Sequence, residues 1–217
     1  MRGSPSWLVD GPATAPIRLL FAHGAGAPMD SPFMGAFACA LAARGWQVLR
    51  FEFPYMERQR QSGKRCAPDR LPKLLESYRE QVHQAGQGAP LLIGGKSMGG
   101  RVASLLVDEL AEAGAVVGCI CLGYPFHPPG QPLNLRTSHL STLSTPTLIV
   151  QGERDPFGHR DEVESYTLSP QIEVEWMPAG DHSFKPTVSS GVSTQQNLER
   201  ASTAIDQFGK TLVRRRP

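Results

Sequence analysis

The sequence predicts an α/β fold: a mostly parallel sheet of six to seven strands with helices on both faces. Two observations support this prediction. Short apolar runs typical of buried strands alternate along the chain with longer runs of helical periodicity. Such alternation is typical of parallel strands joined by helical crossovers. The length of 217 residues and the hydrophobic content of 40% suit a single globular domain, which we expect over residues 1–217.

Six strands are expected where β-branched and other apolar residues cluster. They lie near residues 17–22, 47–53, 91–94, 116–122, 147–151 and 172–177. The residues before the first of them, 1–16, are too few to add a full antiparallel hairpin, so we expect a short N-terminal lead-in. The sheet is therefore trimmed to six or seven strands.

Five helices are expected between and after these strands, near residues 31–44, 68–85, 98–113, 159–166 and 194–208. Ser31 and Pro32 suit a helix cap followed by a first-turn proline, and Gly45 and Gly114 suit helix ends. The arginine-rich residues 210–217 are expected to form a basic tail. No insertion is long enough for a cap domain, so the site at the sheet edge should be open and shallow.

The most informative segment is Gly-Lys-Ser-Met-Gly at 95–99. An apolar run precedes it and a helix-capable run follows it. Gly-x-Ser-x-Gly between a strand and a helix is the sequence form of a nucleophile elbow, a sharp turn that exposes the serine hydroxyl. Glycines are needed because the turn leaves no room for flanking side chains. Ser97 is therefore the candidate nucleophile, and the alternative is a glycine-rich turn with an incidental serine.

Two matching partners follow in the order that this architecture requires, an acid and then a histidine. Asp155 comes just after the strand expected at 147–151, and His182 lies in the loop after the strand expected at 172–177. A serine hydroxyl needs an adjacent base, and a carboxylate would fix the tautomer of that base. The sequence thus predicts a Ser97–Asp155–His182 triad. Glu153 and Asp181 are rival carboxylates.

An oxyanion hole is expected from two backbone N–H groups. The first helix amide after the nucleophile, Met98, is one expected donor. The loop after the first strand contains His23-Gly24-Ala25-Gly26, and its small residues allow close backbone approach, so Ala25 is the second expected donor. Gly24 or Gly26 remains an alternative to Ala25. His23 is expected to be a hydrogen-bonded structural residue rather than a base.

Five segments resemble a known family: residues 23–34, 53–56, 94–101, 122–130 and 152–158. They are similar to an α/β-hydrolase branch of small bacterial predicted hydrolases related to dienelactone hydrolase. That branch is similar in turn to the hydrolase-like domain of animal testis-expressed and non-specific-lethal-complex proteins. The resemblance covers roughly residues 17–208, implies the α/β-hydrolase fold and places the triad at Ser97, Asp155 and His182. Dienelactone hydrolases proper use a cysteine nucleophile, which argues against a dienelactone substrate here.

The overall composition excludes several classes of partner. The formal net charge is +2, so no polyanion and hence no nucleic acid is expected. No apolar stretch approaches the ~20 residues of a membrane span, and no membrane is expected. The four cysteines have no metal-ligand spacing, which favours a reducing cytoplasm. No metal or cofactor is expected, and the chain should be a monomer or homodimer.

Substrate contacts are expected from two loops at the sheet edge. Gly24, Tyr55, Tyr124, Phe126 and His127 are the candidate substrate-binding residues, with Tyr124 and Phe126 forming an acyl wall. The basic segment 57–70 either recognises an anionic group or is a solvated loop, and we favour the solvated loop. Lys96 is expected to point away from the site, where its ammonium could pair with a carboxylate.

These residues predict a metal-independent serine hydrolase that cleaves a carboxylic ester or thioester through an acyl-enzyme. The expected partner is a small-molecule ester, and a shallow site favours short acyl groups because each buried methylene contributes ~0.8 kcal/mol. The alternative is a hydrolase-like scaffold that binds a partner protein without turnover.

Overall fold

The computed structural model describes residues 7–214. A seven-stranded sheet has the order β1-β3-β2-β4-β5-β6-β7, in which β1 is antiparallel to β3 and every other neighbouring pair is parallel. The strands are β1 (Leu8–Asp10), β2 (Ile17–Ala22), β3 (Trp46–Phe51), β4 (Leu91–Lys96), β5 (Gly118–Leu122), β6 (Thr147–Gly152) and β7 (Ile172–Met177).

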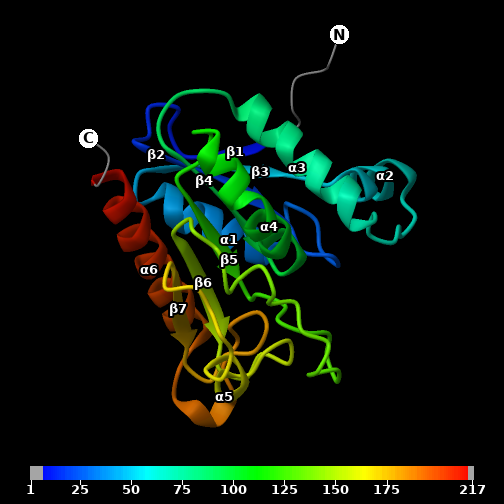
Figure 1. Cartoon of the computed structure of the whole chain (residues 1–217), viewed down its shortest axis with the longest axis vertical. Helices are drawn as coiled ribbons and strands as arrows, with labels where there is room; N and C mark the ends of the chain where they lie inside the picture. Colours follow the sequence, from blue (N-terminus) through cyan, green and yellow to red (C-terminus); the bar gives the residue numbers. More distant parts are fainter. Residues whose placement is uncertain (1–6, 215–217) are drawn as a thin grey trace.

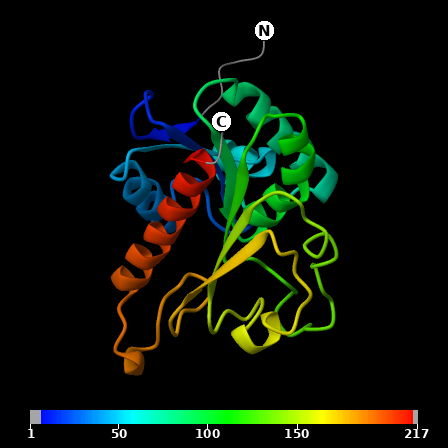
Figure 2. The ribbon, with the colours of Figure 1, turned by 60° about the vertical axis from the view of Figure 1, so that its left-hand side comes forward.

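Helices cover both faces of this sheet (Figure 1). They are α1 (Pro32–Ala42), α2 (Pro54–Ser62), α3 (Leu71–Ala85), α4 (Met98–Glu112), α5 (Arg160–Val163) and α6 (Thr194–Arg214), with a 3₁₀ turn at Val188–Ser190. Helices α3 and α4 pack on one face, and α1 and α6 pack together on the other, as Figure 2 shows from a second side. The α/β fold and its mostly parallel sheet are confirmed.

Two apolar cores hold the layers together. Tyr78 on α3 and Leu106 on α4 pack in the first core, and Phe37 on α1 and Ile205 on α6 pack in the second. All six residues of β2, β4 and β6 are buried, because a parallel strand covered on both faces has no solvent side. A sheet of this kind brings its carboxyl strand ends, and the loops that follow them, to one edge.

Four expectations about elements need correction. The lead-in 1–16 contains β1, and the basic segment forms most of α2 rather than a loop. Helix α5 is one turn long, and α6 continues past residue 208 to Arg214, so the described part of the basic tail is helical. The rest of that tail, 215–217, lies outside the described residues.

The helix boundaries follow ordinary chemistry. Pro32 occupies the first turn of α1, although the Ser31 side chain makes no capping hydrogen bond. Gly45 and Gly114 have φ of +88° and +71° after α1 and α4, a conformation that glycine adopts readily at helix ends. Within residues 7–214 no helix has the length and apolar composition needed to cross a bilayer.

Candidate active site

Ser97 occupies a strained turn between β4 and α4. Its φ of +51° and ψ of −113° are rare for a residue with a side chain. The turn is held from both sides, because Ser97 N donates to Leu122 O at 2.9 Å and Arg101 N donates to Ser97 O at 3.0 Å. Strain of this kind persists where surrounding contacts over-determine it, as at functional sites.

The two glycines of the elbow are required by space. A Cβ added at Gly95 would lie 2.6 Å from Ala22 O and from the carbonyl carbon of Gly99, and one at Gly99 would lie 2.6 Å from Ala22 O. Backbone atoms cannot move away cheaply, so these positions accept no side chain. The glycine requirement predicted from the motif is therefore visible as backbone contact between β2 and the start of α4.

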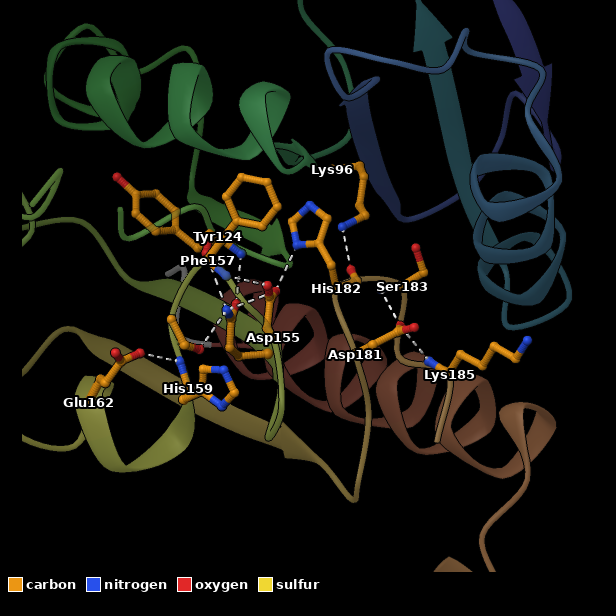
Figure 3. A network of polar contacts seen from close by, with 12 residues as sticks. Lys96, Tyr124, Asp155, Phe157, His159, Glu162, Asp181, His182, Ser183 and Lys185 are labelled. Carbon is orange, nitrogen blue, oxygen red and sulfur yellow. Dashed lines mark hydrogen bonds and ion pairs between the residues drawn. The ribbon is translucent and has the colours of Figure 1, made fainter. Parts of the chain in front are cut away.

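Asp155 and His182 are in direct contact. His182 Nδ1 lies 2.7 Å from Asp155 Oδ2, and Figure 3 shows the imidazole and the carboxylate facing each other. The other bonds of Asp155 come from Gln151 Nε2 at 3.0 Å and from the Phe157 backbone N–H at 2.9 Å. Asp155 is 0% exposed, so its orientation is fixed by three donors.

The rival carboxylates are occupied elsewhere. Glu153 accepts hydrogen bonds from the Ala179 backbone and from Arg160. Asp181 accepts from the backbone N–H groups of Ser183 and Lys185 and so closes the turn after the histidine. Among these three acids, Asp155 is the one that contacts the His182 ring.

The histidine loop is itself strained. Among residues 7–214, three non-glycine residues have positive φ: Ser97, Ala179 (φ +50°) and Phe184 (φ +65°). The last two flank His182, and the Phe157 ring lies against the imidazole with its centroid 4.3 Å away. The strained loop after β7 is thus held in its conformation by the hydrogen bonds to Asp181 and by aromatic packing.

Two glycines lie close to the side chains of His182 and Ser97. A Cβ at Gly123, just after β5, would lie 3.3 Å from His182 Cε1, and one at Gly24 would lie 3.7 Å from Ser97 Cβ. Strands β4, β5 and β6 are neighbours in the sheet. Ser97, Asp155 and His182 therefore follow β4, β6 and β7, whose carboxyl ends lie along one edge of the sheet.

The loop after β2 is clamped by two buried side chains. His23 Nδ1 lies 2.6 Å from Gly24 O, and its Nε2 accepts from the Phe53 backbone N–H at 3.1 Å. The Tyr55 hydroxyl donates to Ala25 O at 3.0 Å. Since C=O and N–H point in opposite directions across a trans peptide, the N–H groups of Ala25 and Gly26 are turned away from these clamps. Burial lowers the pKa of His23, which keeps it neutral and in a structural role.

Lys96 lies beside the nucleophile and reaches the histidine loop. Its ammonium donates to the His182 backbone carbonyl at 2.5 Å, as Figure 3 shows, and sits over the Phe33 and Phe184 rings. No carboxylate pairs with it among the described residues. Burial lowers its pKa to about 8. The expectation that Lys96 points away from the site is wrong, because its ammonium contacts the backbone carbonyl of the candidate histidine, His182.

Four candidate substrate-binding residues are buried. Tyr124 and Phe126 are 0% exposed, and their side chains pack against each other and into the first core. His127 bonds to Pro128 O and to Glu162, and Tyr55 is the clamp described above. In this structure they support the loops rather than form an exposed acyl wall. Gly24 remains next to Ser97.

Two of the five basic residues in the segment 57–70 pair with local carboxylates, and Lys64, Arg65 and Arg70 are exposed. Arg58 pairs with Asp69, and Arg60 pairs with Asp30 and with the buried Glu52. The two arginines hold α2 against the sheet edge. This arrangement agrees with neither a free anion-recognition loop nor a purely solvated one.

Two features near the candidate site were not predicted from the sequence. Gln151 is buried and links Tyr124 N, through its Oε1, to the Asp155 carboxylate, through its Nε2. A polar residue in the otherwise apolar strand at 147–151 was the available signal. The second is Arg101, whose Nε is buried without a hydrogen-bond partner.

An apolar cavity of about 330 Å³ lies beside the histidine loop. Phe33, Phe37, Phe184 and Leu198 contribute its apolar walls. Within the described residues, no group of three or more histidine, cysteine or acidic side chains is placed to hold a metal ion.

Comparisons with known proteins agree with this architecture. A family model described as an alpha/beta hydrolase domain matches residues 15–210. Est1E from Butyrivibrio proteoclasticus matches with a TM-score of 0.68 at 16% identity, over 95% of this chain and 93% of that chain. Dienelactone hydrolase from Anabaena variabilis matches with a TM-score of 0.64 at 21% identity, over 94% and 88%. An α/β serine hydrolase without a lid from Xanthomonas campestris matches with a TM-score of 0.61 at 21% identity, over 96% and 89%. At such identities the structural likeness shows the fold.

Proposed function

Because this chain belongs to the alpha/beta hydrolase domain family, matched over residues 15–210, we propose that it is a serine hydrolase that cleaves carboxylic esters or thioesters. The observation that carries the proposal is the 2.7 Å contact between His182 Nδ1 and the buried Asp155 carboxylate. It leaves Nε2 of the same ring for a proton from a nucleophile, and the strained elbow of Ser97 follows β4 at the same edge of the sheet.

The proposed reaction uses each group in one role. Ser97 Oγ attacks the carbonyl carbon while His182 Nε2 takes its proton, and Asp155 stabilises the imidazolium. The imidazolium then protonates the leaving oxygen or sulfur, which leaves an acyl group on Ser97. Water, deprotonated by His182, releases the acid and regenerates the serine.

The oxyanion of the tetrahedral intermediate would be bound by backbone N–H groups of Met98 and Ala25. Met98 is the first residue of α4, where N–H groups lack intrahelical partners and the helix dipole favours negative charge. The Ala25 N–H is turned away from the His23 clamp. Loss of one such donor typically costs ~2.7–4 kcal/mol of transition-state stabilisation.

We further propose small or short-acyl substrates. Within residues 7–214 no segment forms a cap domain over the site, and few residues are left to enclose a long chain. A steep rise in kcat/KM from butyryl to palmitoyl esters would contradict this part of the proposal.

The proposed location is the cytoplasm, in a monomer or homodimer. Four cysteines are free in the structure, and Cys119 and Cys121 are buried. Free thiols of this kind are typical of a reducing compartment. Light scattering of the purified protein would measure the oligomeric state.

Fluorophosphonate labelling tests the proposal. The wild-type protein should be labelled at Ser97, and Ser97→Ala should lose both labelling and ester hydrolysis while it keeps its circular dichroism. Little packing is lost with one hydroxyl on a turn. Absence of labelling in folded wild-type protein would instead favour a catalytically silent scaffold.

A further inference from the structure

Two arginines near the elbow lack an acidic partner. Arg101 lies in the first turns of α4, and Arg136 lies in the loop between β5 and β6. Both are partly buried, and neither forms an ion pair with any described residue. The Nε of Arg101 is buried and has no hydrogen-bond partner. A buried guanidinium nitrogen without an acceptor is energetically unfavourable, so an acceptor is missing at this place.

The other arginines of the chain show how unusual this is. Several of them form ion pairs with carboxylates: Arg44, Arg50, Arg58, Arg60, Arg79, Arg160 and Arg200. Arg18 and Arg154 donate to backbone carbonyls. Arg65 and Arg70 are exposed to water. Arg101 thus stands apart because it is neither paired nor fully solvated.

Helix geometry places Arg101 near the nucleophile. Its backbone N–H donates to Ser97 O, so it is one helical turn beyond the elbow. Side chains on a helix lean toward its N-terminus and cover the preceding turn. Arg101 therefore follows Ser97 by one helical turn and lies on the same side of α4.

The loop between β5 and β6 brings Arg136 to the side of α4 that carries Arg101, because His139 of the same loop bonds to Ser104 on α4. Arg136 N donates to Phe126 O at 2.7 Å, and the Tyr124 hydroxyl donates to Arg136 O at 2.9 Å. Burial and the nearby charge of Arg101 lower the pKa of Arg136. The two cations therefore lie within range of each other's field and repel each other in the unliganded protein.

Among the described residues, no carboxylate forms an ion pair with either arginine. His139 bonds to Ser104 on α4 at 2.9 Å, and burial together with Arg101 lowers its pKa to about 4, so it is neutral at pH 7. Asp108 is the nearest acid that acts on His139, but its oxygens accept the backbone N–H groups of Ser144 and Thr145. An anion from outside would complete the cluster.

We propose that Arg101 and Arg136 bind a carboxylate carried by the substrate, so that the enzyme prefers esters with an anionic acyl group such as dicarboxylic acid half-esters. A guanidinium presents N–H donors in a planar fork that matches a carboxylate. One turn of α4 separates the backbones of Arg101 and Ser97, so we propose that the carboxylate and the scissile carbonyl belong to one small molecule. The inference rests on the proposed hydrolase function and assigns its substrate class.

The test compares p-nitrophenyl hemiglutarate with p-nitrophenyl butyrate. Arg101→Gln and Arg136→Gln should each lower the ratio of kcat/KM for the anionic over the neutral ester by roughly tenfold or more, since charge-assisted hydrogen bonds are lost. The matched control is Arg79→Gln on α3, whose partner Glu109 is exposed, and its ratio should equal the wild-type ratio. Unchanged ratios in both variants would overturn the inference.

Direct binding separates this inference from the proposed function. Glutarate should raise the melting temperature of Ser97→Ala protein and should shift the Arg136→Gln, Ser97→Ala double variant clearly less. If fluorophosphonate fails to label the wild type but glutarate binds through Arg136, the hydrolase proposal fails and the anion site stands. If labelling succeeds and glutarate shifts neither protein, the anion site fails alone. If Arg101→Gln does not fold, the kcat/KM ratio and the melting-temperature shift of the Arg136→Gln variants still test the inference.

Discussion

Two loops bring a histidine to the same edge of the sheet, one after β2 and one after β7, and the two histidines are chemically opposite. His23 is 0% exposed and both of its ring nitrogens are bonded to backbone groups. The His182 side chain is 23% exposed, and its one protein hydrogen bond among the described residues is that of Nδ1 to Asp155. A histidine can exchange a proton with substrate only through a free nitrogen. The comparison shows that the partners of the ring decide its role, since both histidines follow a strand of the same sheet.

The largest effect is expected from removing the Asp155 carboxylate, the partner that distinguishes His182 from His23. Asp155→Asn removes the carboxylate that fixes the tautomer and stabilises the imidazolium, so kcat should fall by up to ~10⁴ while the fold remains. Steady-state ester hydrolysis measures this change. Asp181→Asn is the matched control, because Asp181 bonds to backbone N–H groups of its own turn. A full rate in Asp155→Asn with a large loss in Asp181→Asn would assign the acid to Asp181.

A feature of the fold or the site could be predicted from the sequence where residues close together in the chain determine it. The order of Ser97, Asp155 and His182 and the buried strands are readable because apolar runs and glycine turns encode them within a few residues. The clamp by Tyr55 and the burial of Tyr124 depend on contacts between distant segments. The interpretation of Tyr124 as an acyl wall was therefore wrong in this structure, since an aromatic residue after a strand can face either the core or the site.

The same limit explains the missed elements. Helix α2 lies in a charged segment without apolar periodicity, and it is stabilised by ion pairs from Arg60 to Asp30 and Glu52. Strand β1 has three residues and is held by pairing with β3 and by the ion pair of Asp10 with Arg50. Partners that lie tens of residues away leave no periodic pattern in the sequence.

The second prediction compares the two histidines by replacing each of them with leucine. His23→Leu leaves the Phe53 N–H and the Gly24 carbonyl without partners, so the free energy of unfolding should fall by about 2–4 kcal/mol. The folded fraction should still be labelled by a fluorophosphonate. His182→Leu should do the reverse, with lost labelling and a nearly unchanged free energy of unfolding in urea titrations. Equal destabilisation of both variants would remove the distinction between the loops.

The third prediction concerns Lys96, which lies between the two loops. Its ammonium is buried without a carboxylate, so Lys96→Met should raise the free energy of unfolding at pH 7, on the order of 1–2 kcal/mol. Turnover should fall, because the His182 carbonyl loses its donor. Lys96→Arg keeps a donor and should retain more activity than Lys96→Met. A destabilised Lys96→Met protein would show that the ammonium stabilises the fold.

The difference in stability between the wild type and Lys96→Met should change with pH in a defined direction. Folding lowers the pKa of Lys96 from 10.5 to about 8, so between these values the unfolded chain binds more protons than the folded one. The stability of the wild type relative to Lys96→Met therefore rises from pH 8 to about 10.5, and the advantage of the methionine shrinks there. Thermal unfolding of both proteins across this range measures the change. A gap that stays constant with pH would mean that Lys96 is solvated in the folded state.

The smallest effect is expected at the clamp of the β2 loop. Tyr55→Phe removes the hydroxyl that donates to Ala25 O at 3.0 Å, and since Ala25 is exposed, water can replace the lost donor. The free energy of unfolding should therefore fall by about 1 kcal/mol, the net value of one hydrogen bond. The peptide that orients the neighbouring N–H groups becomes looser, so kcat should decrease severalfold while KM for a neutral ester changes less, because an oxyanion contact acts in the transition state. A matched change at Tyr166→Phe, far from this loop on the other side of β6, should leave kcat at the wild-type value. If Tyr55→Phe raised KM and left kcat unchanged, the β2 loop would bind the ground state of the substrate, and the assignment of Ala25 as an oxyanion donor would be wrong.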